Sequence, residues 1–262
     1  MRFGGRVVVI TGAGRGLGRA YAELLTQLGA RVVTNDLDEL DGVIHVGDVS
    51  DPAAAEALVG TALDRFGRVD ALINNAGSVA WATMPDIDAA NLEHHFRVHV
   101  VGAFNTVRAA WPHMVSQGVG RIVNTTSSGV FGLKGNLGYA TAKGAVIGMT
   151  RTLALEGAPS NIKVNAIAPA AATRLGGDTS DPNMAPALVA PLVAYLAHED
   201  CPVSGEIYTA GAGRFARLFI ASTPGAETDD VEASWKAIND ETDFFIPADL
   251  ADWSAQFLGH LA

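Results

Sequence analysis

The sequence has little cysteine, no long apolar run and few positive charges. Its one cysteine, Cys201, excludes a disulfide within the chain and a metal site built from several thiolates, which favours a reducing compartment. No apolar run approaches the roughly 20 residues that span a bilayer. The apolar stretch Val7–Ile10 is too short for the core of a signal peptide. We therefore expect a cytoplasmic protein without a membrane segment.

Positive charge is outweighed by negative charge. Lysine and arginine total 18, aspartate and glutamate total 28, and the net charge of −10 has the wrong sign for a nucleic-acid partner. The hydrophobic share of 48% and the charged share of 18% are typical of a compact globule. The Gly-x-Ser-x-Gly turn of hydrolases and the His-Glu-x-x-His motif of zinc enzymes are both missing. The sequence thus predicts no metal site.

Short β-branched runs alternate with longer segments of helical character, the pattern of a parallel sheet covered by helices on both faces. The expected strands are Val7–Ile10, Val32–Asn35, His45–Gly47, Ala71–Asn75, Arg121–Thr126, Lys163–Ala168 and Ile207–Thr209. The expected helices are Leu17–Leu28, Pro52–Phe66, Val98–Ser116, Tyr139–Glu156 and Pro186–His198. No repeat or linker divides the chain. The sequence therefore predicts an α/β fold, a doubly wound parallel sheet of about seven strands in a single domain, 1–262.

Two segments break this alternation. Between Asn35 and His45 there are too few residues for a helical crossover, so we expect a turn there. The stretch Ala170–Ala185 is predicted to be an irregular loop after the sixth strand. Because ligands of α/β proteins bind at the carboxyl ends of the strands, we expect this loop to be a substrate lid. The residues from 214 to 262 are expected to form a C-terminal extension.

A glycine-rich turn, Thr11–Gly18, directly follows the first strand and opens a helix. Its spacing is Gly-x-x-x-Gly-x-Gly, with glycines at positions 12, 16 and 18. Such a turn lets the backbone approach a pyrophosphate, and the helix N-terminus offers free N–H groups to the anion. On its own, a glycine-rich turn is as often only a turn.

An acidic residue, Asp36, ends the second strand at the position where a carboxylate meets the adenosine ribose of a dinucleotide. A carboxylate there accepts two hydroxyl hydrogen bonds and repels a 2′-phosphate, which favours NAD over NADP. Arg15 argues the other way, because its guanidinium could pair with that phosphate. The alternative is that Asp36 is only a solvated turn residue beside Asp38, Glu39 and Asp41.

Tyr139 and Lys143 stand four residues apart in a helical segment and therefore share one helix face. A nearby ammonium favours the phenolate, so Tyr139 is a candidate general acid/base for interconverting an alcohol and a ketone. Pairs at this spacing are also common on protein surfaces. Hydroxyl groups gather upstream, at Thr125, Thr126, Ser127 and Ser128, where they could hold a substrate oxygen or cap the turn.

Together, Thr11–Gly18, Asp36, Asp48-Val49, Asn74–Gly77 and Tyr139-x-x-x-Lys143 resemble the short-chain dehydrogenase/reductase family, over about residues 6–213. The resemblance implies a Rossmann-type fold. It implies that Tyr139 is the acid/base and that Lys143 binds the nicotinamide ribose and lowers the pKa of the tyrosine. The residues expected to bind the cofactor are Thr11, Gly12, Arg15, Gly16, Leu17, Gly18, Asp36, Leu37, Asp48, Val49, Asn75, Ala76, Gly77, Tyr139, Lys143, Pro169 and Thr173.

Three positions depart from the family pattern. The catalytic serine corresponds to Thr126, and we expect Thr126 to take its role, with Ser127 as the alternative. The asparagine that supports a water in the proton relay corresponds to His99, which could serve in the relay or only pack in its helix. The usual Pro-Gly after the sixth strand is Pro169-Ala170.

Several segments, among them Asn35–Leu37, Val98-His99 and Ala109–Met114, are similar to one branch of the family, the (3R)-hydroxyacyl-CoA dehydrogenase units of peroxisomal multifunctional enzymes type 2. That branch also carries a histidine in the fourth position. It implies a 3-hydroxyacyl-CoA as substrate, although the chain ends without a Ser-Lys-Leu address.

Two other functions stay open from the sequence. One is an NADPH-dependent ketoacyl or carbonyl reductase, which Asp36 disfavours. The other is a regulatory protein that binds NAD without catalysis, which His99 and Thr126 favour and the intact Tyr139 and Lys143 oppose. The family resemblance also implies that the apolar helices 98–116 and 139–156 pair across a two-fold axis, which gives a homodimer or homotetramer.

Overall fold

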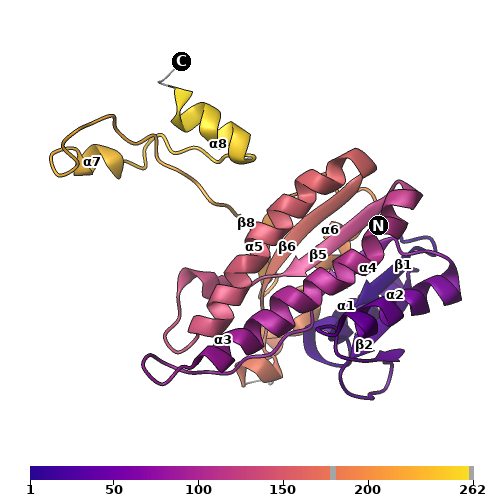
Figure 1. Cartoon of the computed structure of the whole chain (residues 1–262). Helices are drawn as coiled ribbons and strands as arrows, with labels where there is room; N and C mark the ends of the chain where they lie inside the picture. Colours follow the sequence, from indigo (N-terminus) through magenta and orange to yellow (C-terminus); the bar gives the residue numbers. More distant parts are fainter. Residues whose placement is uncertain (178–180, 260–262) are drawn as a thin grey trace. The chain divides into compact units, whose positions relative to one another are not determined.

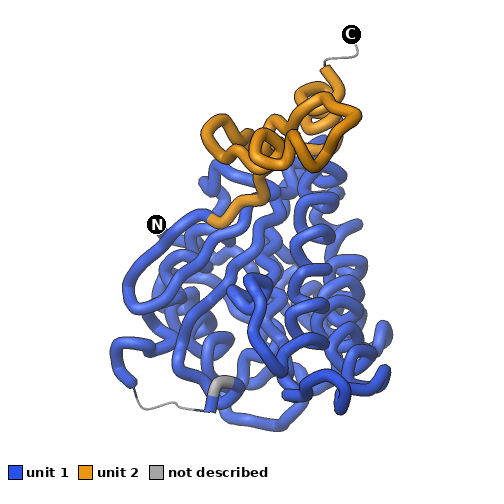
Figure 2. The backbone as a smooth tube through the Cα atoms, turned by 90° about the vertical axis from the view of Figure 1, so that its left-hand side faces the viewer, with its two compact units in different colours: residues 1–217 blue, residues 218–262 orange. Residues whose placement is uncertain are grey.

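The structure of the chain is a computed structural model that describes residues 1–177 and 181–259 (Figure 1). It has two compact units, residues 1–217 and residues 218–262 (Figure 2). The first unit carries every residue that the sequence analysis assigns to a site. The reading of the whole chain as one domain with an extension from residue 214 stays a prediction.

An eight-stranded sheet forms the centre of the first unit, in the order β3-β2-β1-β4-β5-β6-β7-β8. The strands are β1 Val7–Ile10, β2 Arg31–Asp36, β3 His45–Val46, β4 Ala71–Asn74, β5 Gly120–Thr125, β6 Ile162–Ala170, β7 Ile207–Gly211 and β8 Arg214–Leu218. The pairs from β3 through to β7 are parallel. After β3 the chain returns to place β4 beside β1, so the predicted doubly wound order is confirmed, and the crevice between β1 and β4 is the topological switch point.

The eighth strand was not predicted. It follows β7 after a two-residue turn, Ala212-Gly213, in which both residues have positive φ, 49° and 73°. A turn with two positive φ angles suits a tight reversal between neighbouring strands. The segment after it, Arg214–Leu218, is mostly exposed and lies at the edge of the sheet. Its residues, RFARL, include two arginines and do not form an apolar run, so the sequence did not predict a strand here.

Helices cover both faces of the sheet (Figure 1). They are α1 Gly16–Gln27, α2 Pro52–Phe66, α3 Ala89–Phe96, α4 Gly102–Gln117, α5 Leu137–Gly157 and α6 Ala190–Leu196. Side chains alternate between the faces of a strand. In β1, Val8 and Ile10 pack with α1 and α6, whereas Val7 and Val9 pack with α2, α4 and α5. This two-sided burial explains why the central strands are continuous apolar runs.

The helix predicted to begin at Val98 begins earlier. Asp88 caps α3 by accepting the N–H of Asn91 at 2.9 Å, and a single π-helical turn, Arg97–Val101, joins α3 to α4. The predicted start was therefore wrong. The helical segment begins at Ala89, after the Asp88 cap, and its first turns are mostly polar, so they lack the apolar pattern on which the prediction relied. π-helical turns are often found at functional sites.

The two predicted irregular segments contain no long helix among the described residues. No helix lies between β2 and β3, as expected. The described parts of the segment 170–185 hold two short 3₁₀ turns, Arg174–Gly176 and Pro182–Met184. Residues 178–180, which belong to the expected lid, lie outside the described residues, so the lid stays a prediction. Among the residues that the structure describes, no helix is both long and apolar enough to cross a membrane.

The second unit contains two short helices, α7 Trp235–Ile238 and α8 Leu250–Phe257. Two pairs of aromatic rings stack within this unit. The rings of Phe219 and Phe244 lie 6.0 Å apart, and those of Trp253 and Phe257 lie 4.8 Å apart.

Candidate active site

The predicted site residues gather at the carboxyl edge of the sheet. The glycine-rich turn follows β1, the loop that starts at Asn75 follows β4, and Thr126 and Ser127 follow β5. Pro169 lies near the end of β6, where it is paired with Ala210 of β7. Because these strands are parallel neighbours, residues from four distant parts of the sequence meet at one edge.

Hydrogen bonds fix the glycine-rich turn to the loop after β4. The Thr11 hydroxyl accepts the backbone N–H groups of Asn75 and Ala76, each at 3.0 Å. The Asn75 amide donates to the carbonyl oxygens of Thr11 and Gly12 at 3.1 and 2.9 Å. These four bonds place the turn at the switch point without using the N–H groups at the start of α1, which stay available to an anion.

Two glycines of this turn have no room for a side chain. Gly12 has a φ of 61°, and a Cβ atom there would lie 2.7 Å from the Cα of Ala76. A Cβ atom at Gly18 would lie 2.2 Å from the carbonyl oxygen of Gly12. The third, Gly16, also has a positive φ, 56°, and lies beside the Thr173 methyl group. The turn is therefore a tight backbone cradle that fits a dinucleotide pyrophosphate.

The end of β2 closes one side of this cradle. The Asp36 carboxylate accepts the N–H of Gly14 at 2.9 Å and the N–H of Leu37 at 2.9 Å. Arg15 forms an ion pair with Asp38. The Asp36 carboxylate also accepts the N–H of Asp38 at 3.4 Å, and it keeps acceptor capacity beyond these three bonds, since a carboxylate has about four acceptor sites.

The other predicted cofactor residues lie around the same edge. Val49 is buried, and Asp48 is exposed and accepts the Ser50 N–H at 2.9 Å. Leu17 packs against the core, whereas Leu37 is 66% exposed. Val49 therefore lines a pocket beside Thr11, whereas Leu37 lies largely in solvent.

Tyr139 and Lys143 lie in the first two turns of α5. The Lys143 ammonium is 5.5 Å from the centre of the Tyr139 ring and donates to the Thr125 carbonyl at 2.7 Å. Burial lowers the pKa of Lys143 to about 7. Burial also raises the pKa of Tyr139, against a smaller lowering by its hydrogen bond with Ser127. The net shift of the Tyr139 pKa is upward in this arrangement, in which the Lys143 ammonium is directed to a carbonyl, and the expected lowering by Lys143 stays a prediction.

The two candidates for the serine position have different partners. Ser127 is half-buried, and its hydroxyl accepts the N–H of Gly129 at 3.0 Å and lies on the same side of Gly129 as the Tyr139 ring, where it lowers the pKa of the phenol. Thr126 is 1% exposed, and its hydroxyl donates to the Lys143 carbonyl at 2.8 Å. The Thr126 hydroxyl faces the backbone of α5, whereas the Ser127 hydroxyl lies beside the phenol. The assignment of the serine role to Thr126, with Ser127 as the alternative, stays a prediction.

His99 lies in the π-helical turn and is 3% exposed. Its Nε2–H donates to the Ser78 carbonyl at 2.8 Å, which leaves Nδ1 as a buried acceptor without a partner. Burial lowers the pKa of His99 to about 2, so the ring is neutral. The ring stands edge-on to Tyr139 with centroids 5.1 Å apart. A Cβ atom at Gly77 would lie 2.8 Å from the His99 ring, so a glycine at position 77 makes room for it.

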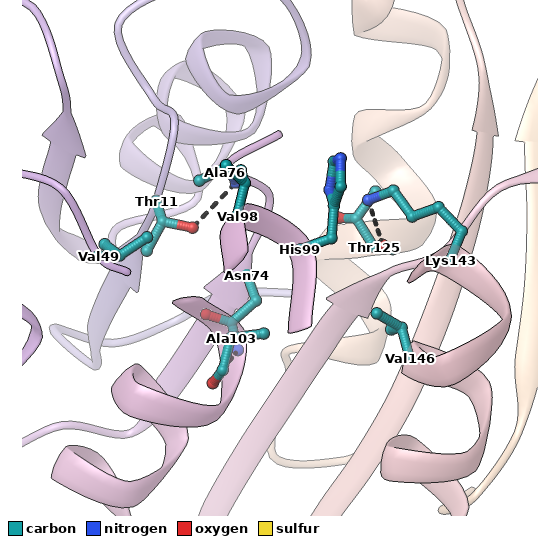
Figure 3. Close-up of a pocket in the computed structure, with 10 residues that line it drawn as sticks. All are labelled: Thr11, Val49, Asn74, Ala76, Val98, His99, Ala103, Thr125, Lys143 and Val146. Carbon is teal, nitrogen blue, oxygen red and sulfur yellow. Dashed lines mark hydrogen bonds between the residues drawn. The ribbon is translucent and has the colours of Figure 1, made fainter. Parts of the chain in front are cut away.

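A small pocket with a mixed polar and apolar lining lies between the cradle and α5 (Figure 3). Its lining residues are Thr11, Val49, Asn74, Ala76, Val98, His99, Ala103, Thr125, Lys143 and Val146. Two buried polar atoms there, His99 Nδ1 and Thr125 Oγ1, have no partner in the structure. Unpartnered buried polar atoms beside the Lys143 ammonium fit a site that binds a polar group.

Sequence reasoning missed a buried polar network below this pocket. The Asn74 amide donates to Asn124 at 3.0 Å and accepts from Thr106 at 2.6 Å, and Asn124 donates to Thr150 at 3.1 Å. The network joins β4, β5, α4 and α5 under the site. The available signal was Asn124, which directly follows the apolar pair Ile122-Val123 in β5.

Metal ligands are not clustered in the part of the chain that the structure describes. No group of three or more histidine, cysteine, aspartate or glutamate side chains there could hold a metal ion. The adjacent His94 and His95 make separate hydrogen bonds, to the Ser78 hydroxyl and to the backbone of Ala80 and Asn91.

Comparison with known proteins relates this geometry to a family. The family described as short chain dehydrogenase matches residues 6–181. A Mycobacterium tuberculosis protein named as a short-chain type dehydrogenase/reductase is 39% identical, over 90% of this chain and 94% of its own length. Peroxisomal multifunctional enzyme type 2 of Mus musculus is 40% identical over 86% of this chain, and the match spans only 34% of that enzyme.

Solved structures agree with these matches. Full-length peroxisomal multifunctional enzyme type 2 from Drosophila melanogaster superposes with a TM-score of 0.79 at 29% identity, over 100% of this chain and 50% of that one. A short chain dehydrogenase from Mycobacterium avium gives a TM-score of 0.76 at 31% identity, over 97% and 94% of the two chains. The chain therefore belongs to the short-chain dehydrogenase/reductase family of NAD(P)-dependent oxidoreductases.

Proposed function

We propose that this protein is an NAD-dependent dehydrogenase that interconverts a secondary alcohol and a ketone, with Tyr139 as the general acid/base. The observation that carries the proposal is the position of the Tyr139 ring, whose centre lies 5.5 Å from the Lys143 ammonium, beside the Ser127 hydroxyl. This group lies at the same edge of the sheet as the glycine cradle. A proton-transfer group next to a dinucleotide site is the arrangement that alcohol oxidation requires.

The cradle residues and Asp36 would hold NAD, which supplies a hydride acceptor and donor when it is bound. The N–H groups at the start of α1 would bind the pyrophosphate. The Asp36 carboxylate would accept ribose hydroxyls and would repel a 2′-phosphate. These residues support NAD as the cofactor in preference to NADP.

Tyr139 would take the hydroxyl proton of the alcohol in the oxidative direction. Because burial raises its pKa, a positive charge near the phenol is needed to favour the phenolate. Lys143 can supply this charge if its ammonium turns from the Thr125 carbonyl toward the phenol side. Ser127 would hold the substrate oxygen, since its hydroxyl already lies beside Tyr139.

His99 would act through its unpartnered Nδ1. A neutral imidazole whose Nε2–H is fixed by Ser78 presents a fixed acceptor to the pocket that also holds Lys143. It can accept a hydrogen bond from a water there and so support a proton relay to Lys143. The alternative, a histidine that only packs, leaves a buried acceptor without a partner, which costs free energy.

For the substrate we propose a 3-hydroxyacyl thioester such as a 3-hydroxyacyl-CoA. The proposal rests on the named activities of the multifunctional relatives, of which this chain spans about a third. Large apolar side chains on two paired loops near the catalytic helix support it. Ala82 and Asn136 pair as a bridge, and Trp81, Met84, Phe131 and Leu133 beside it are more than half exposed.

A ketoacyl reductase is the second candidate. A Thermotoga maritima 3-oxoacyl-[acyl-carrier-protein] reductase is 36% identical over 64% of this chain. Asp36 disfavours this function, because such reductions commonly draw on NADPH. The intact Tyr139 and Lys143 likewise disfavour a regulatory protein that only binds NAD.

The test is a panel of secondary alcohols and 3-hydroxyacyl thioesters with NAD⁺ or NADP⁺, followed by the absorbance of the reduced cofactor. We expect steady reduction of NAD⁺ with a 3-hydroxyacyl thioester and a much slower reaction with NADP⁺. Turnover with simple alcohols alone would contradict the thioester assignment. No turnover with any alcohol, together with tight NAD⁺ binding, would support the regulatory alternative.

A further inference from the structure

The ion pair between Arg15 and Asp38 joins two segments that form the adenosine side of the cradle. Arg15 precedes the first residue of α1 and makes no side-chain capping bond there, and Asp38 lies two residues beyond the end of β2. The two segments touch directly, because the Gly14 N–H donates to Asp36 at 2.9 Å. A Cβ atom at Gly14 would lie 2.9 Å from that carboxylate and 2.5 Å from the end of the Leu40 side chain, which shows how closely the two segments approach.

An arginine at this position can recognise a phosphate. A guanidinium binds a phosphate through two parallel hydrogen bonds, and it sits here in the turn next to the carboxylate that would meet the ribose. In the structure this guanidinium is paired with Asp38. Both side chains are partly exposed, 39% and 59%, and an exposed pair of this kind adds little to the free energy of folding. A stabilising role therefore does not account for the pair.

Resting on the NAD-dependent function above, we infer that Asp38 is a cofactor-specificity residue that holds Arg15 away from a 2′-phosphate. Asp36 repels the phosphate directly, whereas Asp38 removes the positive charge that could compensate for it. Four negative charges face the single positive charge of Arg15 along this edge, those of Asp36, Asp38, Glu39 and Asp41. NADP would have to break the Arg15–Asp38 pair before it gained a partner for its extra phosphate.

The inference predicts that the loss of Asp38 raises the affinity for NADP⁺ relative to NAD⁺. Replacing Asp38 by alanine frees Arg15 for a charge-assisted bond to the 2′-phosphate, and we expect the ratio of the two affinities to rise about tenfold. The matched control is Glu39→Ala, which removes the same charge from the next residue and leaves the ion pair intact. We expect that control to change the ratio by less than about threefold, the size of a screened surface charge effect.

The readout is equilibrium binding, without turnover. Dissociation constants for NAD⁺, NADP⁺ and adenosine 2′,5′-bisphosphate would be measured by calorimetry at low ionic strength for the wild type, Asp38→Ala, Glu39→Ala and Arg15→Ala/Asp38→Ala. The double variant should lose the gain in NADP⁺ affinity, because the guanidinium is absent. Asp38→Asn serves as a second variant, and thermal unfolding checks that each protein is folded.

Three results would overturn the inference. Equal shifts in Asp38→Ala and Glu39→Ala would show that only the net charge matters. A gain that survives in the double variant would show that Arg15 does not bind the phosphate, and an unchanged ratio in Asp38→Ala would show that the pair has no effect. In all three, a wild type that prefers NAD⁺ leaves the proposed function standing. A wild type that prefers NADP⁺ would contradict both.

Discussion

At the scale of single residues, hydrogen-bond direction gives the two candidates for the serine position different surroundings, which supports Ser127 as our proposal. Thr126 and Ser127 are adjacent hydroxyl residues, and the count from Tyr139 favours Thr126. In the structure the Thr126 hydroxyl donates a hydrogen bond to the backbone of α5, and the Ser127 hydroxyl lies beside the Tyr139 phenol. Which of two neighbouring side chains faces the site depends on the turn after β5, and spacing alone does not determine that turn.

We expect Ser127→Ala to lower kcat about 10²-fold, the usual loss when one hydrogen-bond donor to a reacting oxygen is removed. Thr126→Val should act mainly on stability. It removes a buried hydrogen bond to the Lys143 carbonyl and should lower the free energy of unfolding by about 1 kcal/mol. Steady-state kinetics and urea unfolding of both variants check this. The reverse pattern, with kcat lost in Thr126→Val, would restore the assignment made from spacing.

The neutral His99 makes the stability depend on pH. Its pKa is about 2 in the folded protein, against 6.5 for an ordinary histidine. Between these values the unfolded chain binds a proton that the folded chain does not, so the stability falls as the pH decreases below 6.5. The loss from His99 between pH 6.5 and 4.5 should be about 2 kcal/mol. Urea unfolding over this range should therefore give a flatter profile for His99→Gln, and parallel profiles would contradict a neutral buried ring.

At the scale of elements, the glycine-rich turn depends on backbone contacts that admit no side chain. Gly12→Ala would place a residue at a φ of 61° and a Cβ atom against Ala76. We expect a loss of about 1–3 kcal/mol in the free energy of unfolding and a large loss of NAD⁺ affinity. The control is Gly60→Ala in α2, where a Cβ atom would meet nothing within 4 Å.

That control substitution should raise stability by up to about 1 kcal/mol, since alanine is the better helix former. Thermal unfolding and NAD⁺ binding of both variants test the prediction. If Gly12→Ala bound NAD⁺ as well as the wild type, the cradle would not be the pyrophosphate site.

An element can be predicted from the sequence when its own residues show a regular pattern, and not when its limits depend on a single cap or turn. The strands β1, β4 and β6 are mostly apolar and buried, and this pattern is local. The start of α3 depends on a single cap, Asp88, and β8 depends on a turn with unusual φ angles. The π-helical turn that contains His99 has no periodic pattern in the sequence. The sequence therefore identified His99 as a candidate but did not predict its contacts with Ser78 and Tyr139.

At the scale of the whole molecule, the outer surface of α4 and α5 predicts association. Phe104 is 51% exposed and Leu155 is 56% exposed, on helices that are apolar around much of their circumference. We expect light scattering to give two or four times the chain mass of 27.2 kDa. Phe104→Glu should shift the protein toward the monomer, whereas Val46→Glu on the edge strand β3 should not. A wild-type monomer at micromolar concentration would contradict this expectation.

The account as a whole depends on Tyr139 acting as the acid/base beside a bound NAD. The most direct measurement is NADH formation by the wild type and by Tyr139→Phe with the same alcohol, alongside the NAD⁺ dissociation constant of each. The account predicts a loss of about 10²–10⁴-fold in kcat for Tyr139→Phe, with NAD⁺ still bound. A variant that retains the wild-type kcat would contradict it.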